Sequence, residues 1–220
     1  MGPLMNRRFA LPILAMGFVA VASLPAIAKP IYTTKYSYYA INGDTAQEIY
    51  TAMIRRGPHV NGARAYASTS ATSSQEGKLA QGQICSIQDY RLKIDFVIRL
   101  PRIKNEKVLT GTTKARWQQF SRFLKKHEET HRSIWLDCAR DLERQVKAIS
   151  VADCGVADAK ATKLWEQMRK SCARKHDAFD AAEQKRLVRH PFVKLVLNQK
   201  NQLSSAAAVP ARKRKWLAAQ

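Results

Sequence analysis

A long run of helically spaced apolar residues, from about residue 113 to 149, constrains the fold of this chain more than any other feature. Its steps of three or four residues place one stripe along one face of a helix. The stripe consists of Trp117, Phe120, Leu124, His127, His131, Ile134, Cys138, Leu142, Val146 and Ile149. Because such a helix is stable mainly through packing of its apolar face, we expect much of the chain to pack on it.

This helix carries the pattern H-E-x-x-H at His127, Glu128 and His131. Positions four apart on a helix differ by only ~40° in direction, so two imidazoles can aim at one metal ion. Glu128 lies ~60° from His131, where it can take a proton from water without being a ligand. Zinc suits this pattern because it lowers the pKa of a water ligand toward ~7. The motif therefore predicts a Zn2+ site with Glu128 as the catalytic base.

The alternative is that two histidines share a helix face by chance. Both occupy stripe positions between Leu124 and Ile134, where core residues are expected. Buried imidazoles need polar partners, and one metal ion supplies a partner for both. This context favours metal binding.

A catalytic zinc site also needs a third protein ligand and an open fourth position. Asp137 has the spacing of the third ligand in H-E-x-x-H-x-x-G-x-x-H/D proteases, but Ile134 stands where their helix-breaking glycine would be. On a continuous helix Asp137 lies ~9 Å along the axis from His131 and ~120° around it, too far to share the metal. Asp137 is therefore a weak candidate.

A second helix, expected from about residue 156 to 187, offers better candidates. The short break between the helices makes them an antiparallel hairpin. Equal rise from the turn places Cys138 opposite Cys172, which predicts a disulfide there and leaves Cys85 to pair with Cys154.

The same register brings one face of the second helix opposite the two motif histidines. Asp180, His176 and Glu183 lie on that face, and we favour Asp180 as the third ligand. Each residue has another explanation. His176 is otherwise a core histidine, Asp180 an outer partner of a ligand histidine, and Glu183 a solvated charge.

The N-terminal half predicts a small antiparallel sheet. The strands are expected at 31–41, 62–69, 81–88 and 90–100, with Pro101 ending the last one and a polar loop at 70–77. A short helix after Asp44 or Thr45, with Glu48 completing a capping box, ends at Gly57. The expected fold class is α+β, with three or four antiparallel strands packed on the long helix and the second helix closing the site.

Residues 1–28 have the three parts of a secretory signal peptide: basic Arg7 and Arg8, an apolar run, and an Ala-Ile-Ala end at 26–28. The alternative, an uncleaved anchor, is disfavoured because the run is shorter than the ~20 residues that span a bilayer. We expect export to the periplasm or cell envelope, or secretion. The four cysteines of an exported chain favour two disulfides over a metal cluster, because their gaps are wide.

The domain is expected over 29–200, followed by a basic, disordered tail over 201–220. The chain has a formal net charge of +21, which suggests contact with an anionic envelope polymer through its surface and tail. A basic surface also simply keeps an exported protein in solution.

Four stretches resemble a bacterial family of unknown function that is described as predicted secreted zinc-dependent proteases. They are YYAINGDTAQEIYTAMIRRGP, GARAYAST, CSIQDYRLKIDFVIRLPRI and WQQFSRFLKKHEETHRSI, and the resemblance covers roughly residues 36–183. HDAFD (176–180) is similar to a tyrosine-aspartate element of the family, with Phe179 for tyrosine, which supports Asp180. The chain departs from the family pattern at AAEQKR, where the family has a threonine and a histidine-glycine pair. The resemblance implies a zincin-like protease domain.

The sequence thus predicts an exported zinc-dependent metalloprotease that hydrolyses peptide bonds of a protein or of wall peptides. The alternative is a non-catalytic cell-envelope protein that has a structural zinc or no metal and binds anionic polymers through its basic surface. A zinc ion with four protein ligands would leave no position for water and would favour the second function.

Overall fold

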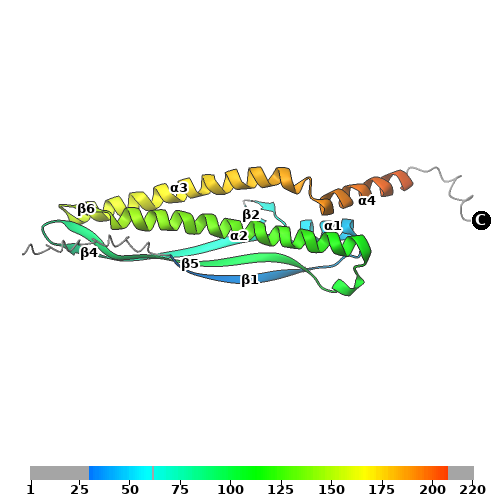
Figure 1. The fold of residues 1–220 in the computed structure, drawn as a ribbon, viewed down its shortest axis with the longest axis horizontal. Helices are drawn as coiled ribbons and strands as arrows, with labels where there is room; N and C mark the ends of the chain where they lie inside the picture. The colour runs from blue at the N-terminus through cyan, green and yellow to red at the C-terminus, as the bar shows by residue number, and fades with distance from the viewer. Residues whose placement is uncertain (1–29, 61, 208–220) are drawn as a thin grey trace, which may run out of the picture.

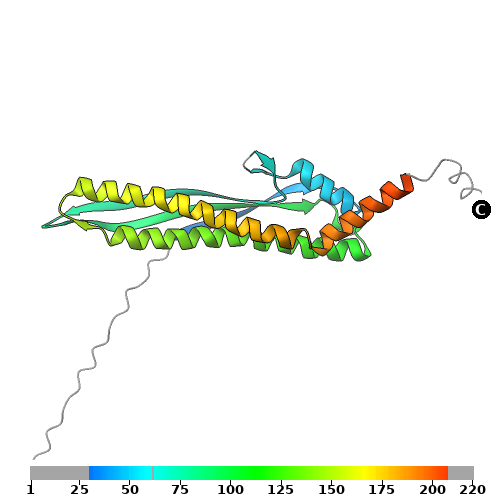
Figure 2. The same cartoon turned by 90° about the horizontal axis from the view of Figure 1, so that it is seen from above.

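The computed structural model describes residues 30–60 and 62–207, so the predicted signal peptide and residues 208–220 lie outside the described residues. Two long helices, α2 (Gly111–Lys147) and α3 (Cys154–Leu187), run antiparallel along the same axis as the longest strands, which gives an elongated molecule (Figures 1 and 2). Helix α2 lies on one face of the sheet and α3 lies alongside α2 (Figure 1). The fold class is α+β, as predicted.

The sheet is built around β5 (Cys85–Ile103). On one edge β5 pairs in parallel with β1 (Ile31–Ile41), and on the other it pairs antiparallel with β4 (Ser68–Gln81). The short strand β6 (Ser150–Val151) pairs antiparallel with the start of β5. The expectation of a wholly antiparallel sheet is therefore wrong. Strand β4 runs back from the end of the molecule where β1 finishes, so β5, which follows β4 after a tight hairpin, runs parallel to β1.

Several strand boundaries also differ from the predictions. The strand expected at 62–69 is divided between the short strand β3 (Ala63–Arg64) and the start of β4 at Ser68. The expected polar loop at 70–77 belongs to β4, and the two strands expected at 81–88 and 90–100 contribute to β4 and to one long strand, β5. The serines and threonines of β4 are compatible with a strand because the sheet's outer face is not covered by helices and is solvated. Pro101 does not end β5, since pairing with β4 already stops at Arg99 and a missing N–H there costs no hydrogen bond on that edge.

The smaller elements lie mainly at one end of the molecule. Helix α1 (Ala46–Arg56) begins with the predicted capping box between Thr45 and Glu48. The short strands β2 (His59–Val60) and β3 (Ala63–Arg64) form a hairpin, and the 3-10 helix η1 (Glu106–Val108) precedes α2.

Helix α4 (Pro191–Ala207) corrects the predicted start of the tail. Residues 201–207 are helical rather than disordered. Phe192 and Val196 anchor α4 in the core, and once a helix is nucleated each further residue adds a backbone hydrogen bond.

Buried apolar side chains form two clusters along α2. The first cluster joins α1, α4 and the first turns of α2 to the end of the sheet where β1 and β5 finish. It includes Trp117, Phe120, Leu124 and Phe192. The second cluster joins the last turns of α2 to α3 and the start of β5, and includes Leu92, Phe96, Leu142 and Met168. The segment of α2 between the two clusters carries the H-E-x-x-H motif.

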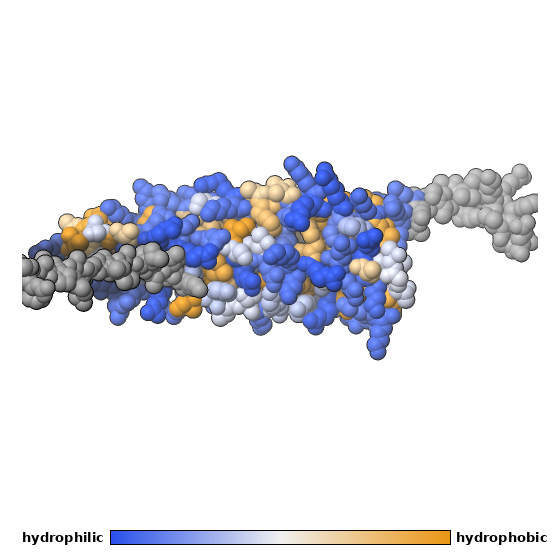
Figure 3. All heavy atoms as spheres, viewed as in Figure 1, coloured by the Kyte–Doolittle hydropathy of each residue, from blue (hydrophilic) through white to orange (hydrophobic). Residues whose placement is uncertain are grey.

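Both predicted disulfides are present. Cys138–Cys172 links α2 to α3, and Cys85–Cys154 links the start of β5 to the start of α3. Cys85–Cys154 holds the start of α3 against the sheet, and Cys138–Cys172 fixes the register of the two helices. The described residues contain no helix that is long and apolar enough to cross a bilayer, and most of the face drawn in Figure 3 is hydrophilic.

One buried carboxylate ties α2 to the sheet. Glu143 is 3% exposed, and its Oε1 accepts a hydrogen bond from the backbone N–H of Leu92 at 2.7 Å. Among the described residues, β5 has no neighbouring strand on this edge between the end of its pairing with β6, at Ser86, and the start of its pairing with β1, at Lys93. Glu143 therefore satisfies a buried donor that the sheet leaves without a strand partner.

Replacing Glu143 with leucine should lower the free energy of unfolding by ~1–3 kcal/mol, because the Leu92 N–H stays buried without an acceptor. Glu143→Gln keeps an acceptor oxygen and is the matched control. Denaturant unfolding with the disulfides intact measures both variants. Equal losses in the two variants would contradict a role for the acceptor.

Candidate metal centre

The polar centre of the molecule lies where the apolar stripe of α2 is interrupted. His127 and His131 face α3 with side chains that are 20% and 14% exposed, whereas Glu128 faces the sheet and is only 4% exposed. The stripe predicted both histidines as inward-facing but did not single out Glu128 as the most buried of the three. Helix α2 has two covered sides here, one against α3 and one against β4.

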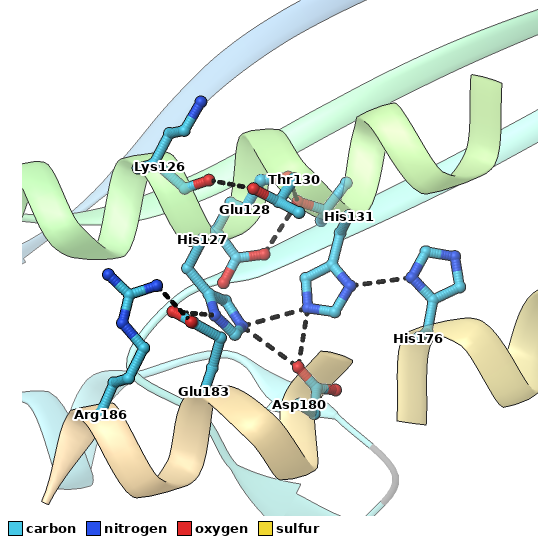
Figure 4. Close-up of polar contacts among 10 residues, drawn as sticks. Lys126, His127, Glu128, Thr130, His131, His176, Asp180, Glu183 and Arg186 are labelled. Atoms are coloured by element: carbon cyan, nitrogen blue, oxygen red, sulfur yellow. Dashed lines mark hydrogen bonds and ion pairs between the residues drawn. The ribbon is translucent and has the colours of Figure 1, made fainter. Parts of the chain in front are cut away.

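Three side-chain atoms from α2 and α3 converge on one point (Figure 4). Nε2 of His127 lies 3.1 Å from Nε2 of His131. Oδ1 of Asp180 lies 3.2 Å from the first of these nitrogens and 3.0 Å from the second. The hairpin thus brings together the two motif histidines and the aspartate that was favoured as the third ligand.

The donor set fits a zinc ion. Two ligand atoms at ~2.0–2.1 Å from a tetrahedral zinc are ~3.3 Å apart, close to the 3.0–3.2 Å edges of the triangle formed by these three atoms. Two imidazole nitrogens and a carboxylate are common zinc ligands. Burial lowers the pKa of both His127 and His131, against the opposing effect of Asp180, and the neutral form is the one that binds a metal.

Glu128 lies beside this triangle and is held from the sheet. Thr69 Oγ1, on β4, lies 2.8 Å from Glu128 Oε2 and 3.0 Å from the backbone oxygen of Glu128. Burial raises the pKa of Glu128 to about 7, and the Thr69 hydroxyl lowers it in part. Among the described residues, Oε1 of Glu128 makes no hydrogen bond, so that oxygen is available to a water molecule or a substrate.

The remaining candidates lie around the triangle rather than in it. Glu183 is buried, and its Oε2 lies 3.9 Å from Nδ1 of His127, an ion-pair distance that is too long for a hydrogen bond. Its other oxygen accepts a hydrogen bond from Arg186 at 2.7 Å. His176 contacts the other histidine: its Nδ1 lies 2.8 Å from Nδ1 of His131.

Asp137 is not part of the centre. It forms an ion pair with Arg140, one turn further along α2, and is 57% exposed. Helix α2 continues through Ile134 without a break, so Asp137 points away from the two histidines, as expected for a helix without the glycine.

A cleft with a volume of about 410 Å³ opens over the three converging atoms. One wall is formed by α2 and α3, and the other by the segment 65–69 that leads into β4. Aromatic and aliphatic side chains, among them Tyr66, Phe123, Leu124 and Leu187, also line the cleft. The half-exposed Asp180 leaves the centre accessible from this cleft.

The sequence pattern missed Thr69. A threonine next to a predicted polar loop carried no signal of its own, since its contact with Glu128 depends on how α2 crosses the sheet. The segment GARAYAST, one of the stretches on which the family resemblance rests, contains this residue and was the only pointer to it.

A comparison with known protein families finds one that matches most of the chain. It matches the bacterial proteins of unknown function grouped as DUF922 over residues 36–187. The chain belongs to this family. The match begins within β1 and ends with α3, so it includes every residue of the centre described above and stops before α4. The description of the matched family, bacterial protein of unknown function, names no activity, so the match does not test the expected protease function. Comparisons with curated proteins and with solved structures found no match.

The geometry predicts that Asp180→Ala weakens zinc binding, while Asp137→Ala leaves it unchanged. The two aspartates have similarly exposed side chains, at 52% and 57%, so neither change should unfold the protein. Loss of a ligand should cost more than the ~10–100-fold that loss of an outer partner costs. Calorimetric titration of the metal-free protein with zinc measures the affinities, and equal affinities in the two variants would exclude Asp180 as a ligand.

Proposed function

We propose that this protein is an exported zinc-dependent metalloprotease. The observation that carries the proposal is the convergence of His127, His131 and Asp180 within one triangle, with the Glu128 carboxylate beside it and a cleft above it. Three protein ligands and an accessible fourth side are typical of catalytic rather than structural zinc sites. The H-E-x-x-H motif on a single helix is also typical of zinc-dependent proteases, in which the glutamate is the general base.

When bound, zinc supplies Lewis acidity toward water and toward a peptide carbonyl. The chain supplies the proton transfers. Glu128 accepts a proton from the attacking water on its free carboxylate oxygen and donates it to the leaving amine. Thr69 holds the other carboxylate oxygen, which fixes the direction of the free one.

The position of the cleft beside β4 supports an extended peptide as the substrate. The start of β4 and the segment before it form one wall of the cleft, and β4 pairs only with β5 among the described residues. We propose that a substrate adds to the remaining edge of β4 and so lies across the zinc site. Apolar side chains of the substrate would then face Tyr66, Phe123 and Leu187.

The two disulfides support export. Disulfides persist in oxidising compartments such as the bacterial periplasm, and all four cysteines of this chain are paired. Together with the N-terminal signal pattern, they favour a location in the periplasm or cell envelope. Recovery of the protein only in the cytoplasm, with free thiols, would contradict this part of the proposal.

Glu128→Gln should abolish peptide hydrolysis and keep the zinc. General acid–base catalysis contributes ~10²–10⁴-fold to a rate, so turnover should fall by that factor or more. Glu129→Gln is the matched control, because Glu129 is the neighbouring carboxylate and bonds to Tyr36 instead. Zinc content and hydrolysis of a broad peptide library are measured on the mature protein. Zinc without turnover in the wild type would favour the non-catalytic, polymer-binding alternative.

Thr69→Val should lower kcat about tenfold or more, since a hydrogen bond to a charged group is worth ~1.5–3 kcal/mol. Valine keeps the shape of threonine but has no hydroxyl, whereas Thr69→Ser keeps the hydroxyl and serves as the control. KM and zinc affinity should change little in either variant. If serine and valine lowered kcat equally, the hydroxyl would not be the feature that orients Glu128.

A further inference from the structure

Each of the two motif histidines has a different partner for its second ring nitrogen. The Nε2 atoms of both rings point at the proposed zinc position (Figure 4). Nδ1 of His127 faces the Glu183 carboxylate at 3.9 Å, whereas Nδ1 of His131 lies 2.8 Å from Nδ1 of His176. The second of these contacts is the shorter one and joins two imidazoles.

The contact between the two imidazoles is directional. A neutral imidazole has one N–H and one lone pair, so a ring that binds metal through Nε2 must carry its hydrogen on Nδ1. In a metal-bound His131 the Nδ1–H therefore points at His176. His176 must accept this hydrogen bond with its own Nδ1 lone pair and carry its hydrogen on Nε2.

The surroundings of His176 are consistent with that arrangement. Its Nε2 lies 3.8 Å from Cys172 Sγ, a sulfur atom of the disulfide that can accept a weak hydrogen bond. The ring of Trp135 lies 5.6 Å from the imidazole, centroid to centroid. The disulfide and the indole thus both lie beside the ring of His176, whose Nδ1 is within hydrogen-bond distance of His131.

His176 also lies one helical turn before Asp180 on α3. Residues four apart on a helix share a face, so one surface of α3 presents both the third ligand and the partner of the second ligand. Because His176 contacts Nδ1 of His131 and not the triangle of converging atoms, its geometry is that of a group that acts through a ligand.

We propose that His176 is a positioning residue: its Nδ1 accepts a hydrogen bond from His131 and thereby holds His131 in the tautomer and ring orientation that bind zinc through Nε2. This inference rests on the proposed zinc site. It assigns to a histidine the role that a carboxylate, a backbone carbonyl or water usually has beside a metal ligand.

Two variants of His176 separate the acceptor from the bulk of the side chain. His176→Phe keeps a ring beside Trp135 and removes the acceptor. His176→Asn removes the ring but has an oxygen acceptor two bonds from Cβ, at the place where histidine has Nδ1. Zinc affinity, measured by calorimetric titration, should fall ~10–100-fold in the Phe variant and should be restored largely in the Asn variant.

Nuclear magnetic resonance of the protein loaded with cadmium-113 reads the tautomers directly. Coupling between the metal and ring nitrogens is expected at Nε2 of His127 and of His131. His176 should show no coupling, and its hydrogen should be on Nε2. This readout does not respond to a loss of stability, which near-ultraviolet circular dichroism of the variants monitors separately.

The outcomes distinguish this inference from the proposed function. A wild type that binds neither zinc nor cadmium would overturn both. A wild type that binds zinc, with a Phe variant of equal affinity, would overturn the role of His176 alone. Coupling of the metal to His176 would show that this residue is a ligand and would also overturn the positioning role.

Discussion

The register between α2 and α3 is the constraint on which the centre depends. The two histidines come from one helix and Asp180 from the other, and a shift of α3 by one residue would rotate its side chains by ~100°. Such a shift would remove Asp180 from the triangle. The Cys138–Cys172 disulfide fixes the register about two turns from His131. The covalent link therefore helps to hold the triangle of His127, His131 and Asp180 together.

The same helix hairpin explains why polar groups can be placed in the interior here. The apolar clusters on either side of the motif supply the packing that holds α2 to the sheet and to α3. Between them, Glu128, His127 and His131 have partners in Thr69, Glu183, Asp180 and His176, so the cost of burying polar groups is offset by hydrogen bonds and ion pairs.

The sequence predicted those features of the site that depend only on the regular geometry of a helix. Rise and rotation per residue place His127 and His131 on one side of the helix. They exclude Asp137 from that side when the helix continues through Ile134, and they bring Cys138 opposite Cys172. The same register placed Asp180 opposite the two histidines together with His176 and Glu183, and so left the choice among the three open. Sheet pairing depends on contacts between distant segments, so the parallel pairing of β1 and the strand nature of residues 70–77 did not follow. The contact between Thr69 and Glu128 could not be predicted for the same reason, because it joins a strand to a distant helix.

The strong positive charge of the chain contrasts with the acidic side chains at the proposed metal site. The chain has 38 lysines and arginines, yet none of those that the structure describes lines the cleft, whereas Glu128, Asp177, Asp180 and Glu183 do. Lys126, next to His127 in sequence, points away from the centre (Figure 4). Arg186 is a cation close to the centre, since it donates a hydrogen bond to Glu183 at 2.7 Å. The four carboxylates that line the cleft outnumber it. The lining of the cleft is therefore acidic although the chain as a whole is basic.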